Sequence, residues 1–371
     1  MALSGVQRSF LTIFLILLLG GSVLYSEMKK RGGDNGEVED DPADQTSLSV
    51  FAANLNVPWS LAFLSDGSLL AAERGGSLKI FKNDSPEPMT VNVPGVSETG
   101  EGGLLGVALH PDFEKNKFIY LYFTARNEGI VVNKVVRYVF DNNALTQNQV
   151  IIDDIPGGTI HNGGRIAFGP DKKLYITTGD AGESDNAQEI KSFSGKILRL
   201  EDNGVIPEDN PFESEIYSYG HRNPQGLAWD EEGRLWSIEH GRSGVQSGFD
   251  EINLIVRGGN YGWPLIQGDQ KREDIISPIL HSGATTTWAP ADLVIIGDKL
   301  YFTGLRGRTL YEVSILPDGR LGGFTEHFQN KYGRLRAMTK GANNEIYFGT
   351  SNKDGRGRPA KDDDKILKLE F

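Results

Sequence analysis

Six segments of the chain share one pattern, in which a polar turn is followed by alternating apolar and polar residues. They read LSDGSLLAAERGG, HPDFEKNKFIYLYFT, GPDKKLYITTGD, DEEGRLWSIEHG, IGDKLYFTGLRG and GANNEIYFGTSN, with turns near residues 66, 116, 171, 232, 298 and 343. Period-two alternation after a turn of Gly, Asn or Asp is typical of antiparallel β-hairpins. No long stretch has helical periodicity, which disfavours a parallel α/β fold.

The spacing of these hairpins predicts the architecture. Intervals of about 45 to 66 residues match the blades of a β-propeller with loop insertions. We therefore predict an all-β fold, a six-bladed β-propeller of four-stranded antiparallel blades. The final strand KILKLEF and the early strand SLSVFAA are expected to share a blade, because this closes the ring and removes exposed sheet edges. The functional loops of such a ring gather at one end of its channel, although the fold alone does not specify a function.

The chain before the first predicted strand has a different character. An uncharged apolar run, FLTIFLILLLGGSVLY, follows Arg8, and its length of about 16 residues lies between a signal-peptide core and a spanning helix. Both interpretations imply export, to the periplasm, the medium or the outer side of the cytoplasmic membrane; a buried core helix is the alternative. The next stretch is polar and acidic, typical of a flexible linker. We predict a signal peptide or N-terminal membrane anchor at 1–25, a charged linker at 26–47 and one propeller domain at 48–371.

Composition narrows the function classes. The chain has 371 residues, 38% of them hydrophobic, with 46 Gly and a net charge of −12. This acidity argues against a nucleic-acid partner, since phosphate binding requires a basic surface. The absence of cysteine excludes disulfides, thiolate catalysis, Fe–S clusters and cysteine-ligated zinc.

A histidine and an aspartate bracket the third hairpin, HNGGRIAFGPDKKLYITTGD. Because the strands are antiparallel, His161 and Asp180 should lie at the same end of a blade. An aspartate bonded to a ring nitrogen fixes the tautomer of a histidine and raises its basicity, as a general base requires. The alternatives are a structural histidine and a turn-capping aspartate.

Arg222 and Asn223 precede a proline in the segment YSYGHRNPQGLAW, which opens the next blade. An arginine there could hold a carboxylate or polarise a carbonyl oxygen, or it could simply pair with an acidic neighbour. Further along, Glu251 lies among Gly-rich turns whose carbonyls, with its carboxylate, suit Ca²⁺. The acidic spacing there is not that of an EF-hand.

Arg334 and Arg336 alternate in the segment YGRLRAM, so their side chains should face the same side of a strand. Two neighbouring guanidinium groups usually require an anionic partner, which a di- or tricarboxylate ligand would supply; solvation at the surface is the alternative. Arg306 in GLRGRTL is a candidate for a third positive group.

From about Val57 to Phe371 the chain resembles the soluble pyrroloquinoline quinone (PQQ)-dependent aldose sugar dehydrogenases, also called soluble glucose dehydrogenase-like proteins. The motifs that carry the resemblance are GGLLGVALHPDF, HNGGRIAFGPD, GKILRL, GHRNPQGLAW, DEINLI with GGNYGWP, and RLRAM, in that order. The resemblance implies a six-bladed propeller that oxidises the anomeric C1 hydroxyl of aldoses to the lactone. Hydride would pass to PQQ, and the electrons to an external acceptor such as a quinone, a cytochrome or a dye.

The resemblance also assigns roles to residues. His161 is similar to the general base, Asp180 to its orienting carboxylate, and Arg222 to the group that stabilises negative charge on the quinone oxygen. The positions that match PQQ contacts are Glu101, His161, Arg222, Asn223, Thr287, Gly304, Leu305, Arg306, Arg334 and Arg336. The positions that match the Ca²⁺ site are Gly241, Arg242, Glu251 and Tyr261, in which Gly241, Arg242 and Tyr261 use main-chain carbonyls.

Three positions depart from the family pattern. Glu101 stands where the family usually has glutamine, and a carboxylate near an anionic cofactor is unfavourable unless it is protonated or paired with arginine. His240 and Arg242 replace the usual glutamine and proline beside the calcium carbonyls. Two other functions compete with sugar oxidation: a non-catalytic propeller that acts as a binding module at the cell surface, and a calcium-dependent lactone hydrolase.

Overall fold

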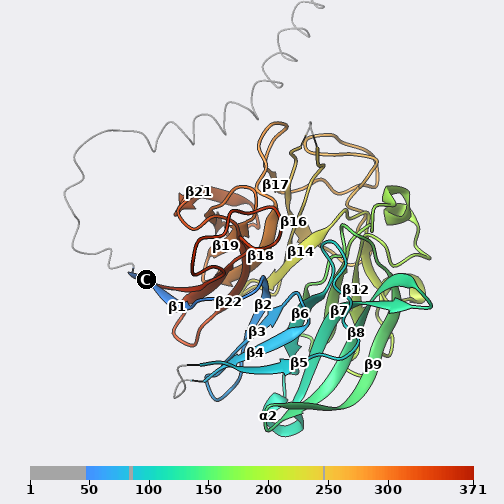
Figure 1. The fold of residues 1–371 in the computed structure, drawn as a ribbon. Coiled ribbons are helices and arrows are strands. Elements are labelled where there is room, and N and C mark those ends of the chain that lie inside the picture. Colours follow the sequence, from blue (N-terminus) through green and yellow to red (C-terminus); the bar gives the residue numbers. More distant parts are fainter. Residues whose placement is uncertain (1–46, 83–86, 245–246) are drawn as a thin grey trace, which may run out of the picture. The chain divides into compact units, whose positions relative to one another are not determined.

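Six four-stranded antiparallel sheets, arranged as the blades of a ring, make up the protein (Figure 1). The structure is a computed structural model and describes residues 47–82, 87–244 and 247–371. Within these residues it contains 24 strands and only three short helical segments. The predicted six-bladed β-propeller is confirmed.

The blades follow one another along the chain. Blade 1 contains β2 (Pro58–Phe63), β3 (Leu69–Glu73), β4 (Ser77–Phe81) and β5 (Met89–Asn92). Blade 2 contains β6 (Leu104–Leu109), β7 (Phe118–Asn127), β8 (Ile130–Asp141) and β9 (Ala144–Pro156). Blade 3 contains β10 (Ile166–Phe168), β11 (Leu174–Thr178), β12 (Lys196–Leu200) and β13 (Ile216–Tyr219). Blade 4 contains β14 (Pro224–Trp229), β15 (Leu235–Glu239), β16 (Glu251–Ile255) and β17 (Leu280–His281).

Blade 5 contains β18 (Pro290–Ile296), β19 (Lys299–Gly304), β20 (Leu310–Ile315) and β21 (Leu321–His327). Blade 6 contains β22 (Leu335–Lys340), β23 (Ile346–Thr350), β24 (Ile366–Glu370) and the early strand β1 (Ser47–Ala52). The helical segments are α2 (Phe113–Asn116), η1 (Ser184–Gln188) and η2 (Pro211–Glu213).

The two ends of the described domain close the ring. Strand β1 pairs with β24, with Ser47 opposite Glu370, so the predicted shared blade is confirmed. The first strand of each blade contacts the first strand of the next, in the order β2, β6, β10, β14, β18, β22 and back to β2. Closure in this way leaves no blade with an unpartnered face between neighbours.

Each of the six predicted hairpins joins the first two strands of a blade. In the first turn the Asp66 carboxylate accepts the Ser68 N–H at 2.8 Å, and Gly67 adopts a φ of +83°, which favours glycine. At the other end of the blades, five of the six innermost strands carry a register irregularity close to their first residue. Such bulges redirect side chains and are frequent beside functional sites.

Apolar side chains fill the space between neighbouring blades. Between blades 1 and 2, Leu70 and Leu78 pack in one cluster with Val107 and Leu121, and each is at most 5% exposed. Strands β3, β11, β12, β15 and β23 are buried along their whole length, as expected for strands covered on both faces.

Arg165 ties the blades together at the centre of the ring. Its guanidinium donates to Ser60 Oγ in blade 1 at 2.9 Å and to the Gln225 carbonyl in blade 4 at 2.9 Å. In blade 5 it donates to the Ala291 carbonyl at 3.1 Å and lies 3.0 Å from the Asp292 carboxylate. One side chain therefore links four blades, with every donor group engaged in a buried environment.

The predicted signal peptide or anchor at 1–25 and nearly all of the predicted linker at 26–47 lie outside the described residues. The first strand begins at Ser47, one residue before the predicted start of the propeller domain. Among the described residues, no helix is long and apolar enough to cross a membrane.

Candidate active site

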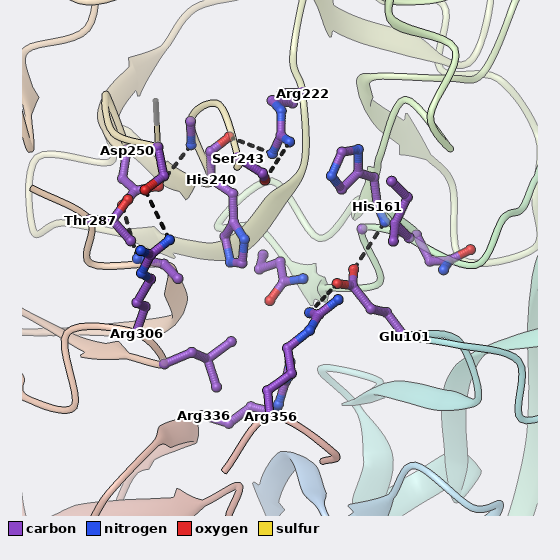
Figure 2. A pocket seen from close by; sticks show the side chains of 18 of the residues that line it. Glu101, His161, Arg222, His240, Ser243, Asp250, Thr287, Arg306, Arg336 and Arg356 are labelled. Carbon is purple, nitrogen blue, oxygen red and sulfur yellow. Dashed lines mark hydrogen bonds and ion pairs between the residues drawn. The ribbon is translucent and has the colours of Figure 1, made fainter. Parts of the chain in front are cut away.

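Loops at one end of the ring enclose a cavity of about 360 Å³ (Figure 2), and all six blades contribute to its lining. The volume lies within the range of small-molecule pockets, roughly 300–1,000 Å³. The chain as a whole has a net charge of −12, yet the described lining contains more arginines than carboxylates. These charged residues are Arg222, Arg242, Arg306, Arg334, Arg336, Arg356, Glu101 and Asp250. The cavity therefore concentrates positive charge and favours an anionic ligand.

His161 and Asp180 form a hydrogen-bonded pair at the cavity. The distance between His161 Nδ1 and Asp180 Oδ1 is 2.7 Å, so the ring's other nitrogen, Nε2, is free to face the cavity that His161 lines. Asp180 also accepts the Gly182 N–H at 2.8 Å and the Trp263 indole N–H at 2.9 Å. Burial opposes ionisation of Asp180, but these donors outweigh it and hold the pKa of Asp180 below its ordinary value.

Glycines allow the His161 loop to pack tightly against the end of β11. A Cβ on Gly163 would lie 2.5 Å from the Thr177 carbonyl oxygen, and a Cβ on Gly179 would lie 1.9 Å from the His161 carbonyl oxygen. Both approaches are far too short for any side chain. His161 itself has a φ of +54°, so its backbone is held in a left-handed conformation that is uncommon for this residue type. The HNGG and TTGD motifs thus specify the position of the imidazole.

Arg222 lies beside the His161–Asp180 pair, since its carbonyl accepts the Asp180 N–H at 2.8 Å, and it is held from several sides. Its backbone N–H donates to Glu239 at 2.8 Å, and its guanidinium donates to Ser243 Oγ at 2.8 Å. The guanidinium carbon is 5.3 Å from the Trp263 ring centroid. Trp263 therefore contacts Arg222 with its ring and Asp180 with its N–H. The sequence analysis did not assign a role to Trp263. The only sequence feature that pointed to it is the GGNYGWP motif, in which an aromatic residue follows Gly-rich turns.

Glu101 is paired with an arginine that the sequence did not identify. Its carboxylate accepts a bond from Arg356 and, at 3.1 Å, the His161 N–H. Burial favours the neutral acid, yet the Arg356 and His161 donors lower the pKa of Glu101 to about 2. Glu101 is therefore ionised, and Arg356 neutralises its charge. Pairing with an arginine, like protonation, makes a carboxylate acceptable near an anionic cofactor.

Arg334 and Arg336 line the cavity together and are only 8% and 7% exposed. Surface solvation, the alternative considered for this pair, is excluded. Asp354 lies between them, 2.8 Å from Arg334 Nε and 3.6 Å from Arg336 Nη2. Burial lowers the pKa of Arg336 to about 10, so it remains charged at neutral pH. One carboxylate balances two guanidinium groups, and a net positive charge is left for a ligand.

The remaining predicted cofactor contacts divide into two groups. Thr287, Leu305 and Arg306 line the cavity. Asn223 and Gly304 do not; Asn223 instead accepts the Gly163 N–H at 3.0 Å and so supports the His161 loop.

Several buried polar atoms at the cavity have no hydrogen-bond partner among the described residues. They are Arg222 Nε, Gln225 Oε1, His240 Nε2 and Arg242 Nε. Figure 2 shows His240 between the side that carries His161 and the side that carries Thr287. Burial lowers the pKa of His240 to about 3, so its imidazole is neutral. Unpaired buried polar groups are costly, and together they fit a polar ligand.

The four predicted calcium-site residues lie around one small cavity of about 10 Å³, which Glu239 also lines. This is close to the smallest volume that holds one water-sized particle. Glu239 is buried and the neighbouring Glu251 is partly buried. Burial together with the charge of Glu239 raises the pKa of Glu251 well above its ordinary value. No cluster of three or more His, Asp or Glu side chains that could hold a metal occurs in the described residues, so a cation here would depend on carbonyls of Gly241, Arg242 and Tyr261.

Comparison with known proteins gives consistent matches along the domain. Residues 55–359 match the Glucose / Sorbosone dehydrogenase family. An uncharacterised protein from Synechocystis is 32% identical over 351 residues, which cover 81% of this chain and 83% of that protein. Quinoprotein glucose dehydrogenase B of Acinetobacter calcoaceticus is 35% identical over 254 residues, which cover 59% of this chain and about half, 52%, of that protein.

A solved structure extends the similarity over nearly the whole domain. The PQQ-bound aldose sugar dehydrogenase of Streptomyces coelicolor is 38% identical and has a TM-score of 0.81. The match covers 89% of this chain and 99% of that one.

Proposed function

This chain belongs to the Glucose / Sorbosone dehydrogenase family, and from that premise we propose that it is a PQQ-dependent aldose sugar dehydrogenase. It oxidises the anomeric C1 hydroxyl of an aldose to the lactone and passes the electrons to an external acceptor. The observation that carries the proposal is the convergence in one cavity of a His–Asp pair and an excess of arginines. These groups come from blades 3 to 6 and are far apart in the sequence.

The cavity fits the proposed cofactor. PQQ is a flat quinone with three carboxylates, and the lining offers guanidinium groups at several points of its wall. Arg334 and Arg336 would bind carboxylates, since Asp354 neutralises only one of their two charges. Arg306 adds a third, more exposed cation that donates to Ser247 Oγ at 2.9 Å. When bound, PQQ supplies the quinone that accepts a hydride from sugar C1.

His161 would take the proton from the C1 hydroxyl. Its Nδ1 is fixed by Asp180 at 2.7 Å, so Nε2 is the basic atom and the imidazolium that forms is stabilised by an ionised carboxylate. Asp180 acts through His161 and does not line the cavity. Arg222, held by Ser243 and by the Trp263 ring, would stabilise negative charge on a quinone oxygen.

A Ca²⁺ ion would occupy the small cavity beside Arg222. Its ligands would be main-chain carbonyls of Gly241, Arg242 and Tyr261 with the Glu251 carboxylate, all oxygen donors of the kind Ca²⁺ requires. Burial and the repulsion from Glu239 raise the pKa of Glu251, and a divalent cation there would relieve that repulsion.

Reconstitution tests the proposal. Protein without cofactor is incubated with PQQ and Ca²⁺, and dye reduction is followed with glucose, galactose, xylose and maltose. We expect turnover with at least one sugar. His161→Ala should still bind PQQ but lose roughly 10²- to 10⁴-fold in kcat, the contribution of a positioned base.

The outcome separates the competing functions. PQQ binding without turnover on any sugar would favour a non-catalytic binding module. Lactone hydrolysis without dye reduction would favour a hydrolase. Export, which we infer from the apolar run in residues 1–25, is tested independently by locating the protein in fractionated cells and measuring the mass of its mature N-terminus.

A further inference from the structure

A second cavity, of about 280 Å³, lies beside the proposed cofactor site, and Arg334 lines both. Four further basic side chains line it, namely Arg308, Lys331, Arg358 and Lys365. Its one acidic lining residue among those described is Asp363. The Asp363 carboxylate is already bonded to the Asn352 amide at 3.0 Å and to the Ala360 N–H at 2.7 Å.

These four cations lack carboxylate partners. None of them forms an ion pair within the part of the chain that the structure describes. Lys331 instead lies over two aromatic rings, 5.4 Å from the Tyr332 centroid and 6.0 Å from the Phe328 centroid. In the cofactor cavity, by contrast, Arg334, Arg336 and Arg356 do have such partners. Like charges gathered around a concave surface repel one another and attract anions. This concentration of positive charge is unexpected on a chain with a net charge of −12.

Two loops join the second cavity to the first. In the loop between β19 and β20, Arg306 lines the cofactor cavity and Arg308 lines the second one. In the loop between β23 and β24, Arg356 lines the cofactor cavity and Arg358 lines the second one. An anion bound in the second cavity would therefore lie beside Arg334, which also lines the cofactor cavity.

We propose that this second cavity is the docking site for a negatively charged electron acceptor, an inference that rests on the proposed dehydrogenase function. Oxidation of one sugar removes two electrons and two protons. Two equivalents of a one-electron acceptor, or one equivalent of a two-electron acceptor, must then remove the electrons from the reduced cofactor, while the protons pass to solvent. A separate acceptor site lets this occur without displacing the sugar from the His161 side of the cofactor cavity.

The test compares two acceptors of opposite charge. Ferricyanide and hexaammineruthenium(III) each accept one electron and carry opposite charges. Each acceptor is compared between the variant and the wild type, so the difference between their reduction potentials cancels. In the charge-reversed variant R308E/K331E/R358E, kcat/KM for ferricyanide should fall about 10-fold or more at low ionic strength. The value for hexaammineruthenium should stay the same or rise. The difference should vanish near 1 M salt, where the Debye length is about 3 Å.

A matched control changes net charge equally. Lys115, Lys172 and Lys340 are exposed and lie at or beside hairpin turns at the other end of the blades. K115E/K172E/K340E should leave both acceptors unaffected. An equal loss with both acceptors in R308E/K331E/R358E, or an equal effect in the two triple variants, would overturn the proposal.

Direct binding provides a readout other than turnover. Ferrocyanide, which cannot accept an electron, is titrated calorimetrically into wild type and both triple variants, with PQQ bound and without it. We expect about a 10-fold weaker affinity in R308E/K331E/R358E only. Unchanged ferrocyanide binding in that variant would exclude the site. No turnover with any acceptor would instead refute the dehydrogenase function, and the titration would then decide the anion site alone.

Discussion

Replacing Asp180 by asparagine should show that the His161–Asp180 pair depends on the hydrogen bond from the Trp263 indole N–H. The Asp180 carboxylate accepts three donors: His161 Nδ1 and the Gly182 N–H at one oxygen, and the Trp263 indole N–H at the other. An asparagine side chain has only one oxygen. The favoured orientation keeps that oxygen toward His161 and Gly182, so the new NH₂ group faces the Trp263 N–H.

The structure sets the expected magnitudes. In Asp180→Asn the Trp263 N–H loses its acceptor, which costs about 1–3 kcal/mol of unfolding free energy. The His161 tautomer is retained, but the imidazolium loses its ionic partner, so kcat should fall roughly 10²-fold within the range for general-base catalysis. Trp263→Phe alone removes a bond to a charged group worth about 1.5–3 kcal/mol and keeps an aromatic ring near Arg222.

The double variant is the decisive measurement. In the Trp263→Phe background no indole N–H opposes the asparagine NH₂, so Asp180→Asn should cost less stability there than in wild type. We expect the two losses to be non-additive by about 1–2 kcal/mol, measured by urea unfolding of the cofactor-free protein. Strictly additive losses would refute the reasoning, because Trp263 would then not act through Asp180.

Three further predictions follow from the charged groups. Glu101→Gln should bind PQQ roughly 10-fold more tightly (about 1.4 kcal/mol), measured by fluorescence titration, since Arg356 is freed for an anion. The unfolding free energy of Glu101→Gln should also fall less than that of the wild type when the pH is lowered. The wild-type Glu101 carboxylate, with a pKa of about 2, stabilises the fold above its ordinary pKa near 4.5 and loses that contribution as the pH falls toward 2. Arg165→Met should cost about 3–5 kcal/mol in urea unfolding, as it leaves Asp292 buried without its cation, and no loss would refute the role of Arg165 at the centre of the ring. Ca²⁺ at 100 times its Kd should stabilise the wild type by about 2.7 kcal/mol, with EGTA reversing the effect, and Glu251→Gln should require more Ca²⁺ for the same shift in thermal denaturation.

The sequence by itself determined the fold. Each hairpin is encoded within about a dozen residues, because strand alternation and turn conformation depend on local side chains and backbone dihedrals. Six such units of similar spacing, with matching strands at the two ends, leave a closed ring as the arrangement without exposed edges. The His161 and Asp180 pair belongs to this local information, since antiparallel pairing of β10 with β11 brings the ends of one hairpin together.

Only the tertiary structure decided which charges are balanced. Glu101 meets Arg356 across 255 positions of the chain, and Trp263 meets Asp180 across 83. Asp354 reaches Arg334 from the next loop of blade 6, and the unpaired cations of the second cavity come from loops of blades 5 and 6. No local pattern specifies such partners, because the loops adopt their positions only when the closed ring fixes their ends. An ion pair or a cavity depends on the final distance between side chains, and this distance is a property of the assembled blades.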